Sequence, residues 1–154
     1  MREANKFDVP ALIEMMRGYA KESPIKALQD SDNEDHVKNI FLALINGRGF
    51  VLIEEGKGML AAVITKNFWN PSVIEVKELA WWVHPDHRNG MVGGRLFVGF
   101  VKKAKQLIRL AKQKNRLISV NTQWPNIIPV LSKYIDLNQI NSLEILFQQG
   151  LSGW

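Results

Sequence analysis

The sequence predicts an α/β fold in which a mixed, mainly antiparallel central sheet carries helices on both faces. Apolar residues recur at helical spacing near the N-terminus, then in short strand-like runs, then again at helical spacing in the second half. Turn residues between the first two strand-like runs indicate an antiparallel hairpin. A strand–helix–strand crossover within Val73–Val120 indicates a parallel pair of strands.

Length and composition favour one globular domain over residues 1–154. The chain is 46% hydrophobic and 23% charged, and it shows no repeat or linker. It has no cysteine, which excludes disulfides, thiolate metal ligands and a cysteine nucleophile. The net charge of +5 favours an acidic partner, such as a phosphorylated cofactor, an acidic protein surface or nucleic acid. A solvated basic face explains the same charge more simply.

The ends and the apolar runs bear on location. Residues 1–10 lack the apolar core of a signal peptide, and no apolar run is long enough to span a bilayer. We therefore expect a cytoplasmic protein with no membrane partner.

Two helices are expected first. Asp8 is placed to cap a helix that tolerates Pro10 in its first turn and ends at Ser23-Pro24. A second helix follows the acidic stretch Asp30–Asp35, and a glycine at 47 or 49 ends it. Its expected apolar face consists of Val37, Ile40, Phe41, Leu44 and Ile45.

Three strands are expected next. Phe50–Ile53 is a short continuous apolar run, and Glu55–Gly58 has turn chemistry. Met59–Thr65 completes the hairpin, Asn70-Pro71 makes another turn, and Val73–Val83 is a long third strand.

The remaining elements follow a polar, glycine-containing loop at residues 84–94. A long helix is expected over Leu96–Ala111 and a strand over Leu117–Val120. Ile127–Ile135 is a candidate short helix, and Ser142–Phe147 a candidate final strand.

The loop is the segment most typical of ligand binding. Free backbone N–H groups at the start of a helix attract anions, and Gly90, Gly93 and Gly94 let the backbone approach a ligand closely. The forked guanidinium of Arg88 suits phosphate. These residues indicate a phosphate or pyrophosphate site, although many glycine-rich loops are only turns.

The run Val83-His-Pro-Asp-His-Arg88, followed by Gly93, resembles the acetyl-CoA loop of the GCN5-related N-acetyltransferases. The family pattern has a glycine between these points, where this chain has Met91, with Gly90 one place earlier. The run Glu-Leu-Ala-Trp-Trp-Val before the loop resembles phage and prophage members. The resemblance extends from Met1 to about residue 126 and fades beyond it.

The resemblance implies that the chain moves an acetyl group from acetyl-CoA to a primary amine by direct attack, without a metal. Loop amides would hold the CoA pyrophosphate, and the main chain of the preceding strand would pair with the pantetheine arm. A main-chain N–H near Val83 would stabilise the oxyanion. The implied cofactor-binding residues are Trp82, Val83, Arg88, Asn89, Gly90, Met91, Val92, Gly93, Gly94 and Asn121.

Two residues are candidates for acid–base work. Glu78 lies on the long strand among apolar neighbours, where burial would raise its pKa and suit it as the base. The alternative is a carboxylate that pairs with Lys66 or Lys77, or that is simply solvated. By the resemblance, Tyr134 would protonate the leaving thiolate, although a core tyrosine is an equally good interpretation. An ordinary turn cap is the alternative for Asn121.

Other interpretations stay open. The chain could be a catalytically inactive module of the same fold, such as a phage protein that docks on host protein or nucleic acid through the basic helix face at residues 102–114. His84 and His87 lack a third ligand at recognisable spacing, which favours loop histidines over a metal site. Small amine, protein and nucleobase acceptors all remain open. A homodimer that pairs residues 142–147 is a further alternative.

Overall fold

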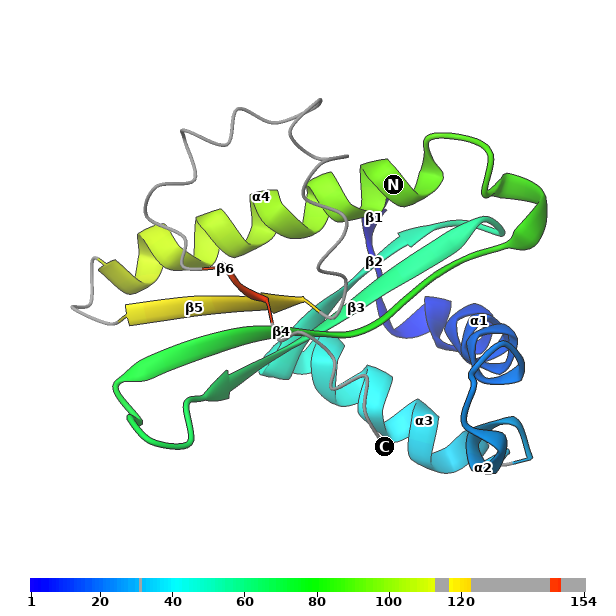
Figure 1. The fold of residues 1–154 in the computed structure, drawn as a ribbon, viewed down its shortest axis with the longest axis horizontal. Coiled ribbons are helices and arrows are strands. Elements are labelled where there is room, and N and C mark those ends of the chain that lie inside the picture. The colour runs from blue at the N-terminus through cyan, green and yellow to red at the C-terminus, as the bar shows by residue number, and fades with distance from the viewer. Residues whose placement is uncertain (31, 113–116, 123–144, 148–154) are drawn as a thin grey trace. The chain divides into compact units, whose positions relative to one another are not determined.

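The computed structural model describes residues 1–30, 32–112, 117–122 and 145–147 (Figure 1). The chain divides into two compact units, one made of Met1–Val63 and Leu79–Val101, the other of Ile64–Glu78 and Lys102–Trp154. The strands are β1 (Arg2–Glu3), β2 (Gly49–Glu54), β3 (Gly58–Lys66), β4 (Val73–Val83), β5 (Leu117–Thr122) and β6 (Ile145–Phe147). The α-helices are α1 (Val9–Lys21), α2 (Lys26–Gln29), α3 (Glu34–Ala43) and α4 (Val92–Lys112), with short helical turns η1 (Lys6–Asp8), η2 (Leu44–Arg48) and η3 (Pro85–His87).

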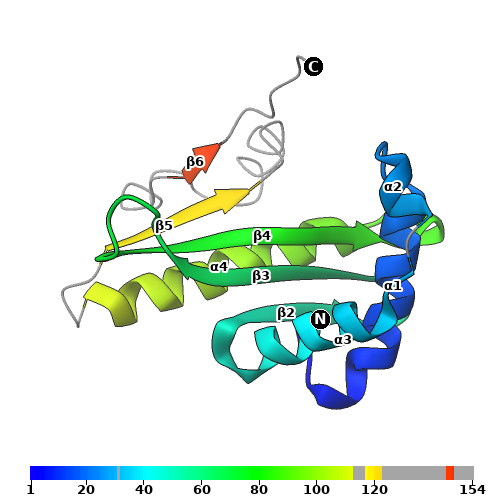
Figure 2. The same ribbon diagram turned by 90° about the horizontal axis from the view of Figure 1, so that it is seen from below.

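The first unit contains β1, β2 and parts of β3 and β4, which are neighbours in that order, and the β1–β2 and β2–β3 pairs are antiparallel. In β2, Val51 and Ile53 belong to the apolar cluster formed with α1 and α3. Phe50 points the other way, with its ring centroid 6.0 Å from that of Phe100 on α4. Because successive strand residues point to opposite faces, β2 is buried on both sides (Figures 1 and 2). The predicted helices on both faces of the sheet are confirmed.

The second unit contains the parallel part of the sheet. β4 pairs with β5 in parallel, with Val73 opposite Leu117, and β5 pairs with β6 in parallel, with Val120 opposite Ile145. The parallel pair expected from the crossover is confirmed. The predicted last strand is present at Ile145–Phe147, and its residues 142–144 and the candidate helix at residues 127–135 lie outside the described residues.

Several boundaries and one face differ from expectation. α4 begins at Val92, before the first apolar position expected at Leu96, because Gly93, Gly94 and Arg95 interrupt the apolar period in its first turn. Ile40 is 39% exposed, so the buried stripe of α3 is narrower than predicted. β1 and α2 were not predicted because each is too short to show a period. Gly47, at φ 104°, ends the second helix as expected.

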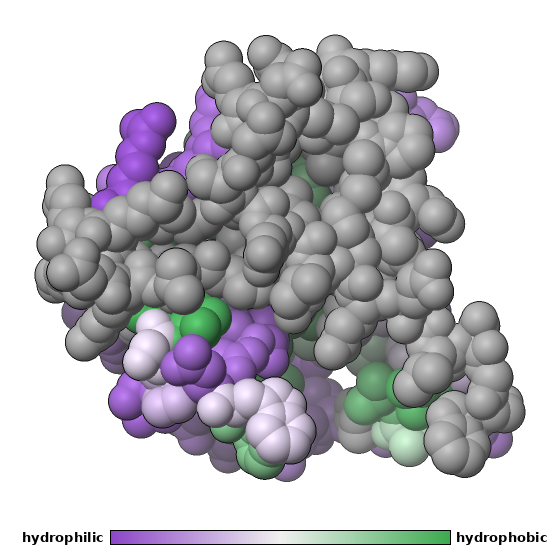
Figure 3. Space-filling view, turned by 60° about the vertical axis from the view of Figure 1, so that its left-hand side comes forward, coloured by the Kyte–Doolittle hydropathy of each residue, from purple (hydrophilic) through white to green (hydrophobic). Residues whose placement is uncertain are grey.

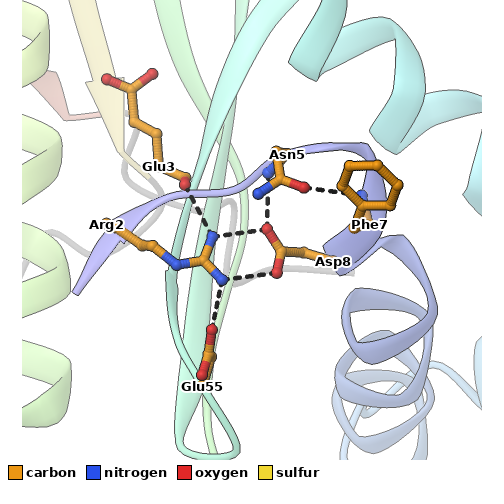
Figure 4. A network of polar contacts seen from close by, with 6 residues as sticks. All are labelled: Arg2, Glu3, Asn5, Phe7, Asp8 and Glu55. Atoms are coloured by element: carbon orange, nitrogen blue, oxygen red, sulfur yellow. Dashed lines mark hydrogen bonds and ion pairs between the residues drawn. The ribbon is translucent and has the colours of Figure 1, made fainter.

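The predicted capping role of Asp8 is wrong. Asp8 occupies the N-cap position of α1, but its side chain makes no hydrogen bond to the helix amides. It accepts instead from the backbone N–H of Asn5 at 2.7 Å and from both terminal nitrogens of Arg2, at 2.7 and 2.8 Å. Arg2 also contacts Glu55 at 2.5 Å, so one guanidinium joins β1, the start of α1 and the β2–β3 turn (Figure 4).

Because of this network, the free energy of unfolding should fall as the solution becomes acidic. The hydrogen bond from Arg2, followed by that from the Asn5 backbone, lowers the pKa of Asp8 from its ordinary 3.8 to about 2. A carboxyl with a depressed pKa stabilises the fold fully above its unfolded pKa and loses this contribution as the pH falls through the folded value. We expect Asp8→Asn to be destabilising at pH 7 and nearly neutral at pH 2, measured by urea unfolding. Asp30→Asn is the exposed control, and an equal loss at both pH values would contradict the assignment.

Candidate functional site

The loop between β4 and α4 lies within the first unit. β4 ends at Val83, and Pro85 begins the turn η3, for which its fixed φ is suited. The Nδ1 atom of His84 accepts from the Asp86 amide at 3.3 Å and caps this turn. His84 therefore has a local structural role. In the described part of the chain, no group of three or more His, Asp or Glu side chains is arranged to hold a metal ion.

The N-terminus of α4 has a row of amides that bond to none of the described residues. The first intrahelical amide is that of Arg95, which donates to the Met91 carbonyl at 2.9 Å. Before it, the structure shows no hydrogen bond to any described residue from four consecutive amides, those of Met91, Val92, Gly93 and Gly94. The helix dipole adds partial positive charge at this end. The row is therefore suited to an anionic group.

The loop glycines leave room outside these amides. A Cβ added at Gly94 would meet no described atom within 4 Å, and one at Gly90 would lie 3.5 Å from the nearest. A Cβ at Gly93 would make ordinary contacts with Trp81 and Val83, at 3.5 and 3.6 Å. None of the three has a positive φ. These glycines matter here because, without side chains, they leave space beside the backbone amides.

Arg88, the predicted phosphate ligand, is already bound to protein. Its Nε–H donates to the Val83 carbonyl at 2.9 Å, and its Nη2 lies 2.6 Å from both carboxylate oxygens of Glu22. This contact lowers the pKa of Glu22. Only Nη1 has no hydrogen bond to a described residue. Arg88 thus ties the end of β4 to the end of α1, and a phosphate would have to use Nη1 or displace Glu22.

Trp82 completes the same contact. Its side chain is 9% exposed, its indole N–H donates to Glu22 at 3.2 Å, and its ring lies directly over Gly18 of α1. A Cβ at Gly18 would come within 2.5 Å of that ring, so only glycine fits there. Because the Trp82 side chain packs against α1, a pantetheine role rests on its main chain alone. Sequence reasoning missed Glu22 and Gly18, and a glycine inside a helical pattern was the one available signal.

A second ion pair lies in the first turn of α4. Arg95 contacts Glu54 of β2 through Nε at 3.1 Å and Nη2 at 2.5 Å, and this lowers the pKa of Glu54. Both arginines near the loop, Arg88 and Arg95, are therefore paired with carboxylates. The attraction for an anion at this loop rests mainly on the backbone amides.

Of the two candidate catalytic residues, the structure describes Glu78 but not Tyr134. Glu78 lies on β4 in the second unit and is 5% exposed, which confirms its predicted burial. Asn121 lies on β5, opposite Lys77 of β4. Tyr134 lies outside the described residues. None of the described helices is long and apolar enough to cross a membrane.

Comparison with known proteins places the fold. Neither a protein family profile nor a curated protein sequence matches the chain. A possible acetyltransferase from Clostridium difficile 630 is 12% identical over 99% of this chain and 95% of its own, with a TM-score of 0.58. A predicted acetyltransferase from Clostridium acetobutylicum, solved with acetyl-CoA, is 16% identical over 86% of each chain, with a TM-score of 0.56. An aminoglycoside acetyltransferase from an uncultured soil sample, solved with sisomicin, is 13% identical over 99% and 92%, with a TM-score of 0.54.

At these identities the comparisons show the fold alone. The chain has the fold of the GCN5-related acetyltransferases, as its sequence predicted. None of the three solved structures is described as a phage protein, so a phage origin stays a prediction.

The Glu22–Arg88 contact can be tested by a double-mutant cycle of Glu22→Gln and Arg88→Gln, read by urea unfolding. Both side chains are 43% exposed, so solvent screening limits the expected coupling to about 0.5–1 kcal/mol. The Glu14–Arg17 pair, three residues apart on α1, is the control. Coupling no larger than in the control would show that the contact does not hold the end of β4.

Proposed function

We propose that this protein transfers an acetyl group from acetyl-CoA to a primary amine. The observation that carries the proposal is the row of four amides at residues 91–94, which bond to no described residue and lie at the start of α4 in a fold shared with acetyltransferases. A diphosphate offers two adjacent anionic groups, which suit a row of N–H donors at a helix start. The open space beside Gly90 and Gly94 accommodates such a ligand.

The rest of the cofactor is assigned by position along the chain. We assign the CoA diphosphate to Asn89–Gly94, with Arg88 contributing through Nη1. The main chain of Trp82 and Val83 would pair with the pantetheine arm, and the Asn121 amide would add to it. The Val83 carbonyl already accepts a hydrogen bond from Arg88. The pantetheine arm would therefore pair with other main-chain N–H and C=O groups of the strand, or Arg88 would have to release this carbonyl.

The chemistry needs a neutral amine. In our proposal Glu78 takes a proton from the amine, whose nitrogen attacks the thioester carbonyl carbon. The tetrahedral intermediate expels the CoA thiolate as the C–S bond breaks, Tyr134 protonates that thiolate, and the resulting tyrosinate takes the second proton from the amide nitrogen. A main-chain N–H near Val83 stabilises the oxyanion. The acceptor is an amine of unassigned class, because acceptor sites are formed by variable loops.

Cofactor binding can be separated from folding at Gly94. We expect Gly94→Val to weaken acetyl-CoA binding by about tenfold or more, because its branched side chain stands in front of the donor amides. Its Cβ meets no described atom, so stability should change by less than about 1 kcal/mol. Titration calorimetry gives the affinity, and Gln106→Val, an exposed position further along α4, is the control. Equal affinity in all three proteins would reject the loop as the diphosphate site.

Turnover tests the base. Glu78→Gln should lower kcat by about 10²-fold or more while leaving acetyl-CoA affinity nearly unchanged, because a general base acts in the chemical step alone. Since Glu78 is buried, thermal unfolding of the variant must first show a native transition. Turnover rates should be measured with a panel of amines over a range of pH. In the variant, the pH–rate profile should lose the rise that reports ionisation of the Glu78 carboxyl. An unchanged pH profile would remove Glu78 from the mechanism.

If this protein does not bind acetyl-CoA, the alternative that it is a catalytically inactive binding module of the same fold is supported instead. Thermal shift with saturating acetyl-CoA distinguishes the two, because a ligand that binds only the native state stabilises it.

A further inference from the structure

The turn between β3 and β4, in the second unit, presents two aromatic side chains to solvent. Phe68 is 88% exposed and Trp69 is 87% exposed. Their rings lie edge to face, with centroids 5.2 Å apart and an interplanar angle of 85°. Single exposed apolar residues are ordinary, but an adjacent pair of large rings at the tip of a turn is costly in water and marks a contact site.

The turn is fixed by its own hydrogen bonds. The Asn67 side-chain oxygen accepts from the backbone amides of Trp69 and Asn70, both at 2.9 Å. The Asn70 side-chain oxygen accepts from the Ser72 amide at 3.0 Å, and the Asn67 amide donates to the Val73 carbonyl at 2.9 Å. These amides are therefore satisfied within the turn, which can enter an apolar environment without stranding them. The same bonds leave them unavailable to a phosphate.

Among the described residues of this unit, the acidic side chains are buried and the basic ones reach the surface. Its two described acidic side chains, Glu75 and Glu78, are buried, and Glu75 is bound by Lys77 at 2.6 Å and by Asn67 at 2.6 Å. Residues 67–74 carry no charge. The described basic side chains of the unit all reach the surface at least in part: Lys66, Lys77, Lys102, Lys103, Lys105 and Arg109.

The backbone places the aromatic turn and part of the basic helix of this unit on one side. In Figures 1 and 2 the β3–β4 turn and the C-terminal end of α4, both parts of the second unit, lie toward the same side. Figure 3, which brings that side forward, shows hydrophilic side chains gathered beside paler and apolar ones.

We propose that the Phe68–Trp69 turn inserts into the interface of an anionic lipid bilayer, with the basic side chains of the same unit facing lipid head groups. Aromatic rings favour the interface, and lysine and arginine side chains are attracted to anionic lipids. A single-stranded nucleic acid is disfavoured, because rings at 85° offer no parallel faces to successive bases and the turn amides are already bonded. The expectation of no membrane partner came from the lack of an apolar span, which peripheral insertion does not need.

Vesicle sedimentation of the full chain tests this. We expect binding to vesicles of equal parts phosphatidylcholine and phosphatidylglycerol, and binding weaker by about tenfold or more to phosphatidylcholine alone or at high salt. The double variant Phe68→Ser with Trp69→Ser should lose about tenfold or more in affinity for the mixed vesicles. Phe7→Ser is the matched control, because Phe7 is 82% exposed, lies in the first unit and has Lys6 beside its ring.

Native folding of each variant is checked by thermal unfolding. Failure of the wild-type protein to bind mixed vesicles would overturn the proposal. So would equal losses in the turn variant and the Phe7 variant. Binding of a single-stranded oligonucleotide that depends on the aromatic pair, without vesicle binding, would also overturn it and assign the turn to nucleic acid.

Discussion

The carboxylate of Glu22 fixes where β4 ends. It accepts from the Trp82 indole and the Arg88 guanidinium, and Arg88 in turn holds the Val83 carbonyl. Gly18 lets the Trp82 ring lie against α1, so helix and strand meet closely enough for these contacts to form. The end of β4 sets the path of the loop, and the loop sets where the amides at the start of α4 point. The candidate anion site therefore depends on an interaction with Glu22 and Trp82, whose side chains do not bind the anion.

Pairing of the nearby charges decides what the loop can recognise. Arg88 and Arg95 are each bound to a carboxylate, so neither offers a whole unpaired charge. What remains is a set of oriented N–H dipoles, which bind anionic oxygens by direction and spacing. A ligand recognised this way needs several oxygens arranged in a row, a demand that a diphosphate meets better than a single carboxylate.

Most of the described strands and helices could be predicted from the local spacing of apolar residues, although Ile40 is exposed where that spacing predicted burial. The sequence predicted the strands between Phe50 and Val83 and the apolar face of α4. These elements depend on the spacing of apolar residues within a short stretch of sequence, which can be seen without knowing the fold. The hydrogen-bond partners of Asp8 and Arg88 were not predicted. Asp8 could equally have capped α1, and the partner of Arg88, Glu22, lies 66 residues away along the chain. The loop was located from its glycines and its place between strand and helix, whereas the actual bonds of Arg88 required the fold to bring Glu22 alongside.

A site made of main-chain N–H groups places few demands on side-chain identity. Substitutions that preserve the strand–turn–helix path leave its donors in place, so the residues of such a protein can change almost freely while the architecture persists. Solved structures that match 86–99% of the chain at 12–16% identity show this fold on largely different sequences. Backbone geometry therefore identifies this fold in a chain whose amino-acid sequence matches no family profile.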